Sequence, residues 1–165
     1  MLSAVLALLL SAGAADGGPA AVEPAPAPLR EFSIDGLTAR WQTEGNALLV
    51  DLDGATDGWV LIGFNDLDAL AGSRLFFARV VSGKLDVQEH LAVPPEHRRV
   101  DRSGLLGLAH ATERMRTRVR VSIPLGEHER VSLTPSRSYY VTLAWSMSDD
   151  FFHHSARREA QRITL

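Results

Sequence analysis

Six consecutive residues in the first half of the chain read Trp59-Val60-Leu61-Ile62-Gly63-Phe64, and they constrain the fold more than any other segment. Large apolar side chains occupy every position except the glycine. The polar residues that alternate with apolar ones on a strand facing water are missing. A near-continuous apolar run of this length is typical of a strand buried on both faces. We therefore expect this segment at the centre of a sheet whose two faces are both covered.

The segments before this run show the alternation that it lacks. Within residues 36–44, the apolar residues Leu37, Ala39 and Trp41 alternate with polar ones. Residues 47–52 form another strand-like run after the turn signal Gly45-Asn46. Period-two alternation bounded by turn residues predicts strands with one buried face.

Further strand-like runs follow at 75–81, 84–93, 118–123, 139–145 and 161–165. Together these runs predict about eight or nine strands, or slightly more. Residues 103–116 are expected to hold one helical turn or an irregular excursion, and no segment shows the pattern of a long amphipathic helix. Strands at this spacing without intervening helices predict an all-β, antiparallel fold, either a sandwich or a barrel.

The composition is that of an ordinary globular domain. The chain has 165 residues, 45% hydrophobic residues and a formal net charge of −3, which suits one domain with its own core. The negative charge gives a nucleic-acid partner no general electrostatic support. The absence of cysteine excludes disulfide bonds, thiolate metal sites, a cysteine nucleophile and covalently attached haem.

The sequence also lacks familiar catalytic motifs. It contains no Gly-x-Ser-x-Gly nucleophile motif, no phosphate loop and no dinucleotide fingerprint. No residue stands out as a nucleophile. We therefore expect a protein without catalytic activity of its own.

The first thirty residues differ in composition from the rest. Residues 1–10 form an apolar run without Lys or Arg and residues 11–15 are small, which predicts a signal peptide over 1–15; the alternative is a buried N-terminal helix. Residues 16–30, rich in Ala, Pro and Gly, are interpreted as a linker, and residues 31–165 as the folded domain. The protein is accordingly expected to be periplasmic or secreted, with no membrane span in the mature chain.

The densest group of ionisable side chains follows the run 139–145. Asp149, Asp150, His153 and His154 fall within six residues, between aromatic neighbours. Neutral imidazole is a good ligand for haem iron, zinc or copper, and a nearby carboxylate can fix the tautomer of a ligating histidine. In an extended segment only one of two adjacent histidines faces a given cavity, whereas in a turn both can converge. The alternative is a pair of surface or packing histidines, with the aspartates capping a turn.

Two other groups carry both a functional and a plain structural interpretation. Trp59 either stacks on a sugar ring or packs in the core. Arg118 and Arg120 belong to a basic stripe. This stripe is either a solvated strand face or a site for an anionic ligand, including the propionates of haem.

Two acid–imidazole pairs, Glu89-His90 and Glu96-His97, lie near the expected end of the strand 84–93. On that strand His90 shares one face with other polar residues. If that face is wet, these groups are simply solvated side chains, and we adopt that interpretation.

The central apolar run also belongs to a longer pattern. Residues 57–65 read Asp-Gly-Trp-Val-Leu-Ile-Gly-Phe-Asn, and they are followed by Ala71-Gly72-Ser73 and then by the run 75–81. A later apolar run and a histidine-bearing segment complete the order. Over residues 32–165 this pattern resembles the DOMON domain. The segment 149–155 is similar to that of bacterial stand-alone members of the family.

The resemblance implies an extracytoplasmic, immunoglobulin-like β-sandwich of two antiparallel sheets that binds haem b or sugars and in many members transfers electrons. In haem-binding members one axial ligand is a methionine in the loop after the Gly-Phe strand, and the other is a histidine near the C-terminal end. His153 and His154 are the candidates for that histidine. Leu70 stands where the methionine is expected. Leucine has no donor atom for iron, so the second axial ligand is left unassigned.

Three hypotheses stay open. The first is a non-catalytic binding module for haem or a carbohydrate, anchored by His153 or His154. The second is a haem b electron carrier with a redox partner, in which His154 is an axial ligand of the iron. The third is a structural or interaction domain without a small-molecule ligand.

Overall fold

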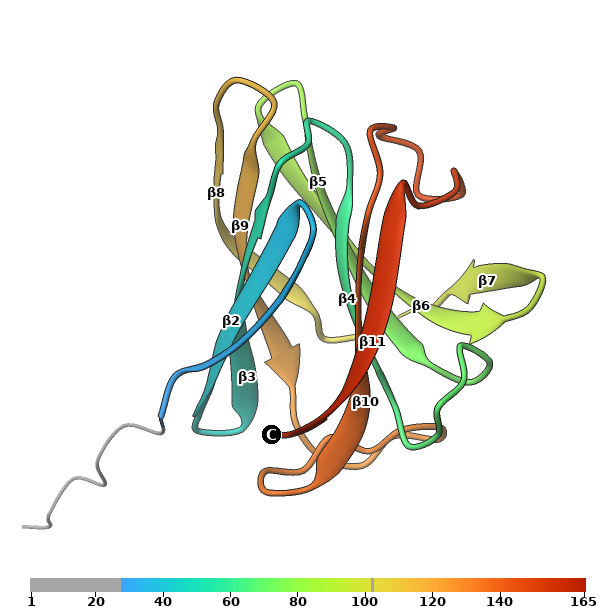
Figure 1. Ribbon diagram of the computed structural model, residues 1–165. Helices are drawn as coiled ribbons and strands as arrows, with labels where there is room; N and C mark the ends of the chain where they lie inside the picture. Colours follow the sequence, from blue (N-terminus) through green and yellow to red (C-terminus); the bar gives the residue numbers. More distant parts are fainter. Residues whose placement is uncertain (1–27, 102) are drawn as a thin grey trace, which may run out of the picture.

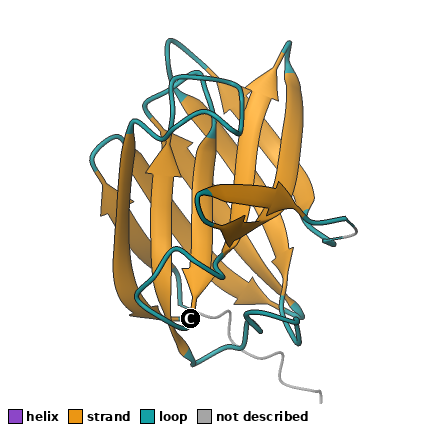
Figure 2. Cartoon of the chain, turned by 90° about the vertical axis from the view of Figure 1, so that its right-hand side faces the viewer, coloured by secondary structure: helices purple, strands orange, loops and turns teal. Residues whose placement is uncertain are grey.

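The computed structural model describes residues 28–101 and 103–165, and these residues form a sandwich of two antiparallel β-sheets (Figure 1). Figure 2 shows the strands of one sheet lying across those of the other. Eleven strands build the two sheets, and the described residues contain no helix, hence none that could span a membrane. The expected all-β, antiparallel sandwich is confirmed.

The first sheet has the strand order β1-β2-β3-β9-β8. Its members are β1 (Arg30–Ile34), β2 (Leu37–Glu44), β3 (Ala47–Gly54), β9 (Thr117–Pro124) and β8 (Leu106–Thr112). The second sheet has the order β11-β10-β4-β5-β6-β7. Its members are β11 (Arg157–Thr164), β10 (Ser138–Trp145), β4 (Val60–Asn65), β5 (Arg74–Val81), β6 (Lys84–Val93) and β7 (Glu96–Arg99).

Every strand expected from the sequence is present, and three more were not expected: β1, β7 and β8. The helical turn or irregular excursion expected at 103–116 is wrong, because β8 occupies most of that segment. All side chains of β8 are exposed, so it carries no alternation signal. It exists because it pairs with β9 at the sheet edge, with a bulge between Gly107 and Ala109.

The expected signal peptide at 1–15 lies outside the described residues, as does most of the expected linker at 16–30. Arg30, expected as the last linker residue, is the first residue of β1.

The central run behaves as its composition predicts. All six residues of β4 are buried, and the strand lies between β10 and β5 in the second sheet. Its even-numbered residues Val60, Ile62 and Phe64 pack in the core between the two sheets. On the other face of the second sheet, Trp59 and Leu61 belong to a separate apolar cluster. A second apolar surface therefore lies outside the sandwich core.

Candidate functional site

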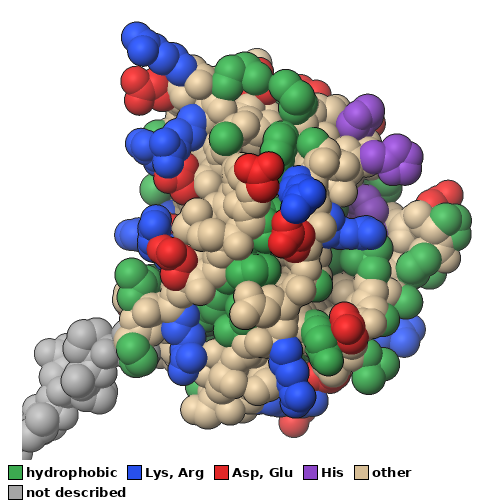
Figure 3. Space-filling view, viewed as in Figure 1, with side chains coloured by type: hydrophobic (Ala, Val, Ile, Leu, Met, Phe, Trp, Pro, Cys, Tyr) green, Lys and Arg blue, Asp and Glu red, His purple; other side chains and the backbone are tan. Residues whose placement is uncertain are grey.

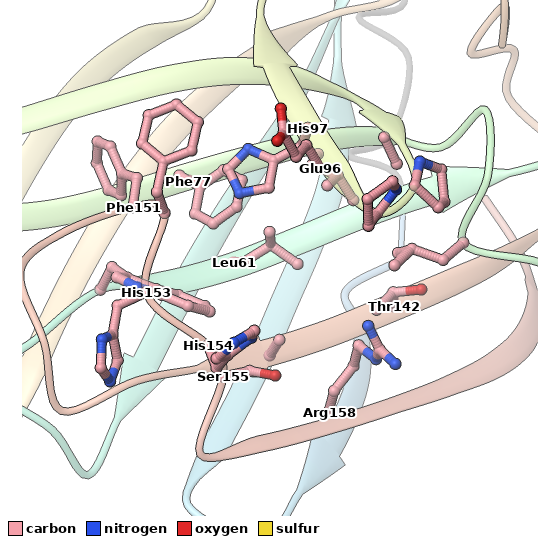
Figure 4. Close-up of a pocket in the computed structure, with 18 residues that line it drawn as sticks. Leu61, Phe77, Glu96, His97, Thr142, Phe151, His153, His154, Ser155 and Arg158 are labelled. Carbon is pink, nitrogen blue, oxygen red and sulfur yellow. The ribbon is translucent and has the colours of Figure 1, made fainter.

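A hollow of about 420 Å³ opens on this outer face of the second sheet. It lies between the loop joining β10 to β11 and the hairpin of β6 and β7 (Figure 4). Its floor is apolar and consists of Trp59, Leu61, Leu75, Phe77, Ala92 and Ala144. Its rim is polar and aromatic, and includes His97, Phe152, His153, His154, Ser155 and Arg158.

The loop between β10 and β11 is held against the start of β4 by contacts that require glycine at position 58. The amide of Trp59 donates to the Ser148 carbonyl at 3.1 Å, and the amide of Ser146 donates to the Trp59 carbonyl at 3.0 Å. A Cβ atom on residue 58 would clash with the carbonyl oxygens of Ser146 and Ser148. Gly58 therefore allows the histidine-bearing loop to lie directly against the central strand.

Arg79 and Phe151 fix the outer half of the same loop. The guanidinium carbon of Arg79 lies 4.2 Å from the centroid of the buried Phe151 ring, and Arg79 also donates to the Asp149 carbonyl. At the base of the loop, the hydroxyl of Ser146 donates to the carbonyl of His154 at 3.1 Å. These contacts hold the loop against β5 and the end of β10.

His153 and His154 both lie on the rim of the hollow. The chain turns here, and the two ring centroids are 6.4 Å apart. Figure 4 shows the His154 ring beside Ser155 at the hollow, and the His153 ring further out on the loop. Within the described part of the chain, no group of three or more His, Asp or Glu side chains is arranged to hold a metal ion.

Asp149 and Asp150 take part in shaping the turn. The Oδ1 atom of Asp150 accepts a hydrogen bond from the Phe152 amide at 3.0 Å, and its carbonyl accepts one from the His153 amide at 3.0 Å. The carbonyl of Asp149 accepts from Arg79. Neither aspartate lines the hollow. Their contacts are those of the turn-capping interpretation.

A second pair of histidines, on β6 and β7, forms the opposite wall. The side chain of His90 is completely buried, so the expected solvated face on the strand 84–93 is wrong at this residue. Its ring centroid lies 4.9 Å from that of Phe77, and its Nδ1 atom lies 2.6 Å from Nδ1 of His97. The face is covered because Phe151 and Phe152, from a loop about sixty residues later in the chain, pack over it.

The position of His97 could have been predicted from strand pairing, although the residues next to it in the sequence do not indicate it. β6 and β7 pair across Pro94-Pro95, with Ala92 opposite His97. A hairpin drawn through the two prolines would have placed His97 beside Ala92, on the same face as His90. Reading the prolines only as the end of a strand misses this placement.

Burial lowers the basicity of both rings. It lowers the pKa of His90 to about 4, and the neighbouring His97 and Arg99 reinforce the shift. Burial also lowers the pKa of His97, although the Phe151 carbonyl and nearby acidic groups partly offset the effect. Both imidazoles are therefore neutral at pH 7, the form in which a ring nitrogen can bind a metal.

Trp59 and Leu70 lie in the hollow, as parts of its apolar lining. The ring of Trp59 is buried and meets Phe77 edge to face, with centroids 5.2 Å apart. Leu70 stands at the position where the family resemblance implies a methionine. The position of that methionine and the predicted histidines therefore share one hollow.

Arg118 and Arg120 lie on the outer face of the first sheet, away from this hollow. Nε of Arg120 donates to Oδ1 of Asp51 at 2.7 Å, and Nε of Arg118 lies 3.5 Å from Oδ2 of Asp53. Figure 3 shows basic and acidic side chains interspersed on the left side of the molecule, and histidines gathered on the right. The arginine at the hollow is Arg158 of β11.

Comparison with known proteins adds to this picture at the level of the fold. No protein-family model matches the chain, and no curated protein matches it. Among solved structures, the chain is similar to the cytochrome b domain of pyranose dehydrogenase from Coprinopsis cinerea. The TM-score is 0.69 at 11% sequence identity, over 82% of this chain and 81% of that chain. The chain has a DOMON-like fold, and at this identity the likeness concerns the fold alone.

Proposed function

We propose that this protein is a non-catalytic haem b-binding module that transfers electrons, with the haem held in the hollow on the second sheet. The observation that carries this proposal is the hollow itself, whose apolar, aromatic floor is bordered by imidazoles. The similarity in fold to a cytochrome b domain supports it. When bound, haem supplies a one-electron ferric–ferrous couple.

The chemistry of the lining fits this group. Haem is a flat apolar ring with two carboxylate arms, and its iron needs one or two ligands from the protein. The floor offers aromatic and aliphatic surface for the ring, and His154 offers an imidazole to the iron. Arg158 on the rim offers a cation to a carboxylate arm. The volume of about 420 Å³ falls within the range of about 300–1,000 Å³ usual for ligand pockets.

The same floor disfavours a carbohydrate. A sugar loses many hydrogen bonds to water when it is bound, and the site must replace them. Alkyl and aromatic side chains such as Leu61 and Ala144 cannot do so. Trp59 is buried against Phe77, so its ring is not free to stack on a sugar in solvent.

Export belongs to the same proposal and rests on residues 1–15, which have the composition of a signal peptide. In this setting the module would exchange one electron at a time with a redox partner outside the cytoplasm. Cell fractionation of the tagged full-length chain tests this part. Recovery of the protein only from the cytoplasm would contradict it.

The visible spectrum of the purified protein, expressed with a haem supply, tests ligand binding. We expect a Soret band that follows the protein through gel filtration. His154→Ala is expected to weaken haem binding at least about tenfold, because an iron ligand is lost. His110→Ala, at an exposed histidine of β8 on the first sheet, is the matched control and should bind as the wild type does. A colourless wild type that also fails to take up added haemin would refute the proposal.

A further inference from the structure

We propose that His97 is the second axial ligand of the haem iron, on the opposite side of the ring from His154. This inference rests on the proposed function and concerns the same hollow. It assigns to the β6–β7 hairpin a ligand that the family resemblance placed in the loop after β4. The module would then have bis-histidine coordination.

The loop after β4 cannot supply that ligand. Leu70 is the residue of this loop that lines the hollow, and its side chain is a hydrocarbon. It packs against the apolar cluster on the floor. Any donor atom on this side of the hollow must therefore come from another element.

His97 is placed where such a donor is needed. It pairs with Ala92, a floor residue, across the β6–β7 hairpin, and it lines the hollow itself. Figure 4 shows His97 and His154 on opposite sides of the hollow, with the floor residue Leu61 between them. Two imidazoles that approach from opposite walls have the arrangement that a flat ring between them requires.

The ring of His97 is also held in a fixed orientation. It stacks on Phe152, with centroids 4.9 Å apart and planes inclined by 3°. On its other side it stacks on Phe77, at 5.1 Å and 28°. A ring clamped between two aromatic rings loses little freedom when it binds iron, which favours binding.

A chain of hydrogen bonds holds the ring of His97 in place through His90. The carboxylate of Asp86 only accepts, and Arg79 holds it in an ion pair at 2.7 Å. The amide Nε2 of Gln88 points to this carboxylate, at 3.3 Å. The amide oxygen of Gln88 is therefore directed at His90, whose Nε2 lies 3.1 Å away and must donate.

The last contact of this chain joins His90 to His97. His90 is completely buried, and the Nδ1 atoms of the two rings are 2.6 Å apart and share one proton. One edge of the His97 ring is therefore fixed against His90. A ligating histidine whose other nitrogen donates a hydrogen bond is the usual arrangement at protein metal sites.

Visible and electron paramagnetic resonance spectra of the haem-loaded protein test the assignment. We expect low-spin, six-coordinate iron in the wild type and high-spin, five-coordinate iron in His97→Ala. His110→Ala, at an exposed histidine of β8 on the first sheet, is the matched control and should stay low-spin. A His97→Ala protein that remains fully low-spin overturns the assignment. A wild type that binds no haem overturns the proposed function instead, so the two failures are distinguishable.

Two rescues separate loss of a ligand from loss of structure. Added imidazole is expected to return His97→Ala to the low-spin form, because it replaces the missing donor. The double variant Leu70→Met/His97→Ala is expected to gain a sulfur-to-iron charge-transfer band, because position 70 lines the same hollow. Circular dichroism confirms that each variant is folded. Failure of both rescues in folded, haem-containing protein counts against His97.

The hydrogen-bond chain has its own test. His90→Leu removes the hydrogen-bond partner of His97 and is expected to weaken haem binding about 10–100-fold, with a mixture of spin states at saturating haem. His90→Gln keeps an amide that can hydrogen-bond to His97 and should restore most of the low-spin signal. A fully low-spin His90→Leu protein with unchanged affinity would show that His90 does not position the ligand.

Discussion

The two outer faces of this sandwich are built from the same kind of strand but differ in chemistry. On the first sheet, outward residues of β3 form ion pairs with arginines on β9 or just before it, such as Arg120–Asp51 at 2.7 Å and Arg116–Asp53 at 2.6 Å. On the second sheet, the outward residues around β4 are apolar and border a hollow. The hollow therefore lies where the usual alternation of buried and exposed side chains along a strand is interrupted.

The cause lies in the sequences of the two strands. In β3, buried and partly exposed residues alternate over all eight positions. In β4 all six positions are buried. An apolar sheet face with no second layer of strands or helices must be covered by loops or by a ligand. Here two connecting segments cover its edges and leave the centre open.

Placing a charge on the apolar face should have the largest effect on stability. Leu61→Asp places a carboxylate on the apolar floor without a partner, and we expect it to lower the free energy of unfolding by more than about 4 kcal/mol. The reciprocal control Asp51→Leu changes the solvated face and should alter stability little. Urea denaturation monitored by circular dichroism measures both. Equal losses in the two variants would show that the faces are not energetically distinct.

Gly58→Ala should have the next largest effect, because the new methyl group meets two carbonyl oxygens of the β10–β11 loop. We expect a loss of about 2–4 kcal/mol in unfolding free energy together with weaker haem binding. The exposed neighbour Asp57→Ala is the control. If Gly58→Ala binds haem with wild-type affinity, the loop does not depend on this close approach.

Ala144→Phe should fill the hollow and leave the sandwich intact. We expect a stability change of about 1–3 kcal/mol and the loss of haem uptake, because the new ring occupies the floor. Ser122→Phe, at an outward position of β9 on the other sheet, should take up haem normally. Haemin titration followed by absorbance makes the measurement. Full haem uptake by Ala144→Phe would show that haem binds somewhere other than this hollow.

The smallest effect concerns the charged face and its dependence on pH. The hydrogen bond from Arg116 lowers the pKa of Asp53 below its ordinary value of 3.8. Because the folded state holds the proton less tightly, this pair contributes stability above pH 3.8 and loses it as the pH falls through the lowered value.

Asp53→Asn should therefore be slightly less stable than the wild type at pH 7, within the small range of surface ion pairs, and this difference should shrink as the pH falls below 3.8. Haem uptake should not change. Denaturation curves recorded across this pH range measure the difference. A difference that does not shrink on acidification would assign it to packing and not to charge.

The sequence was sufficient for the strands whose burial follows a local pattern. β4 could be predicted because no charged residue interrupts its apolar run, and β2 because its apolar residues alternate with polar ones. β8 could not be predicted, since its side chains are all exposed and only pairing with β9 makes it a strand. Its conformation is decided by a partner and not by its own residues.

The same limit applies to the site. His153 and His154 could be singled out because they are adjacent to each other in a loop after an apolar strand. His90 could not, because its burial depends on Phe151 and Phe152, far away in the sequence. For Arg118 and Arg120 the sequence left both a solvated face and an anion site open, because a strand pattern shows which residues share a face but not which sheet that face belongs to.

The central strand divides its tasks by the parity of residue number. Val60, Ile62 and Phe64 hold the two sheets together, whereas Trp59 and Leu61 shape the hollow. Evolution or a designer can therefore resize the odd-numbered positions for a differently shaped guest while the even-numbered ones keep the scaffold. The architecture is thus open to changes of ligand without a change of fold.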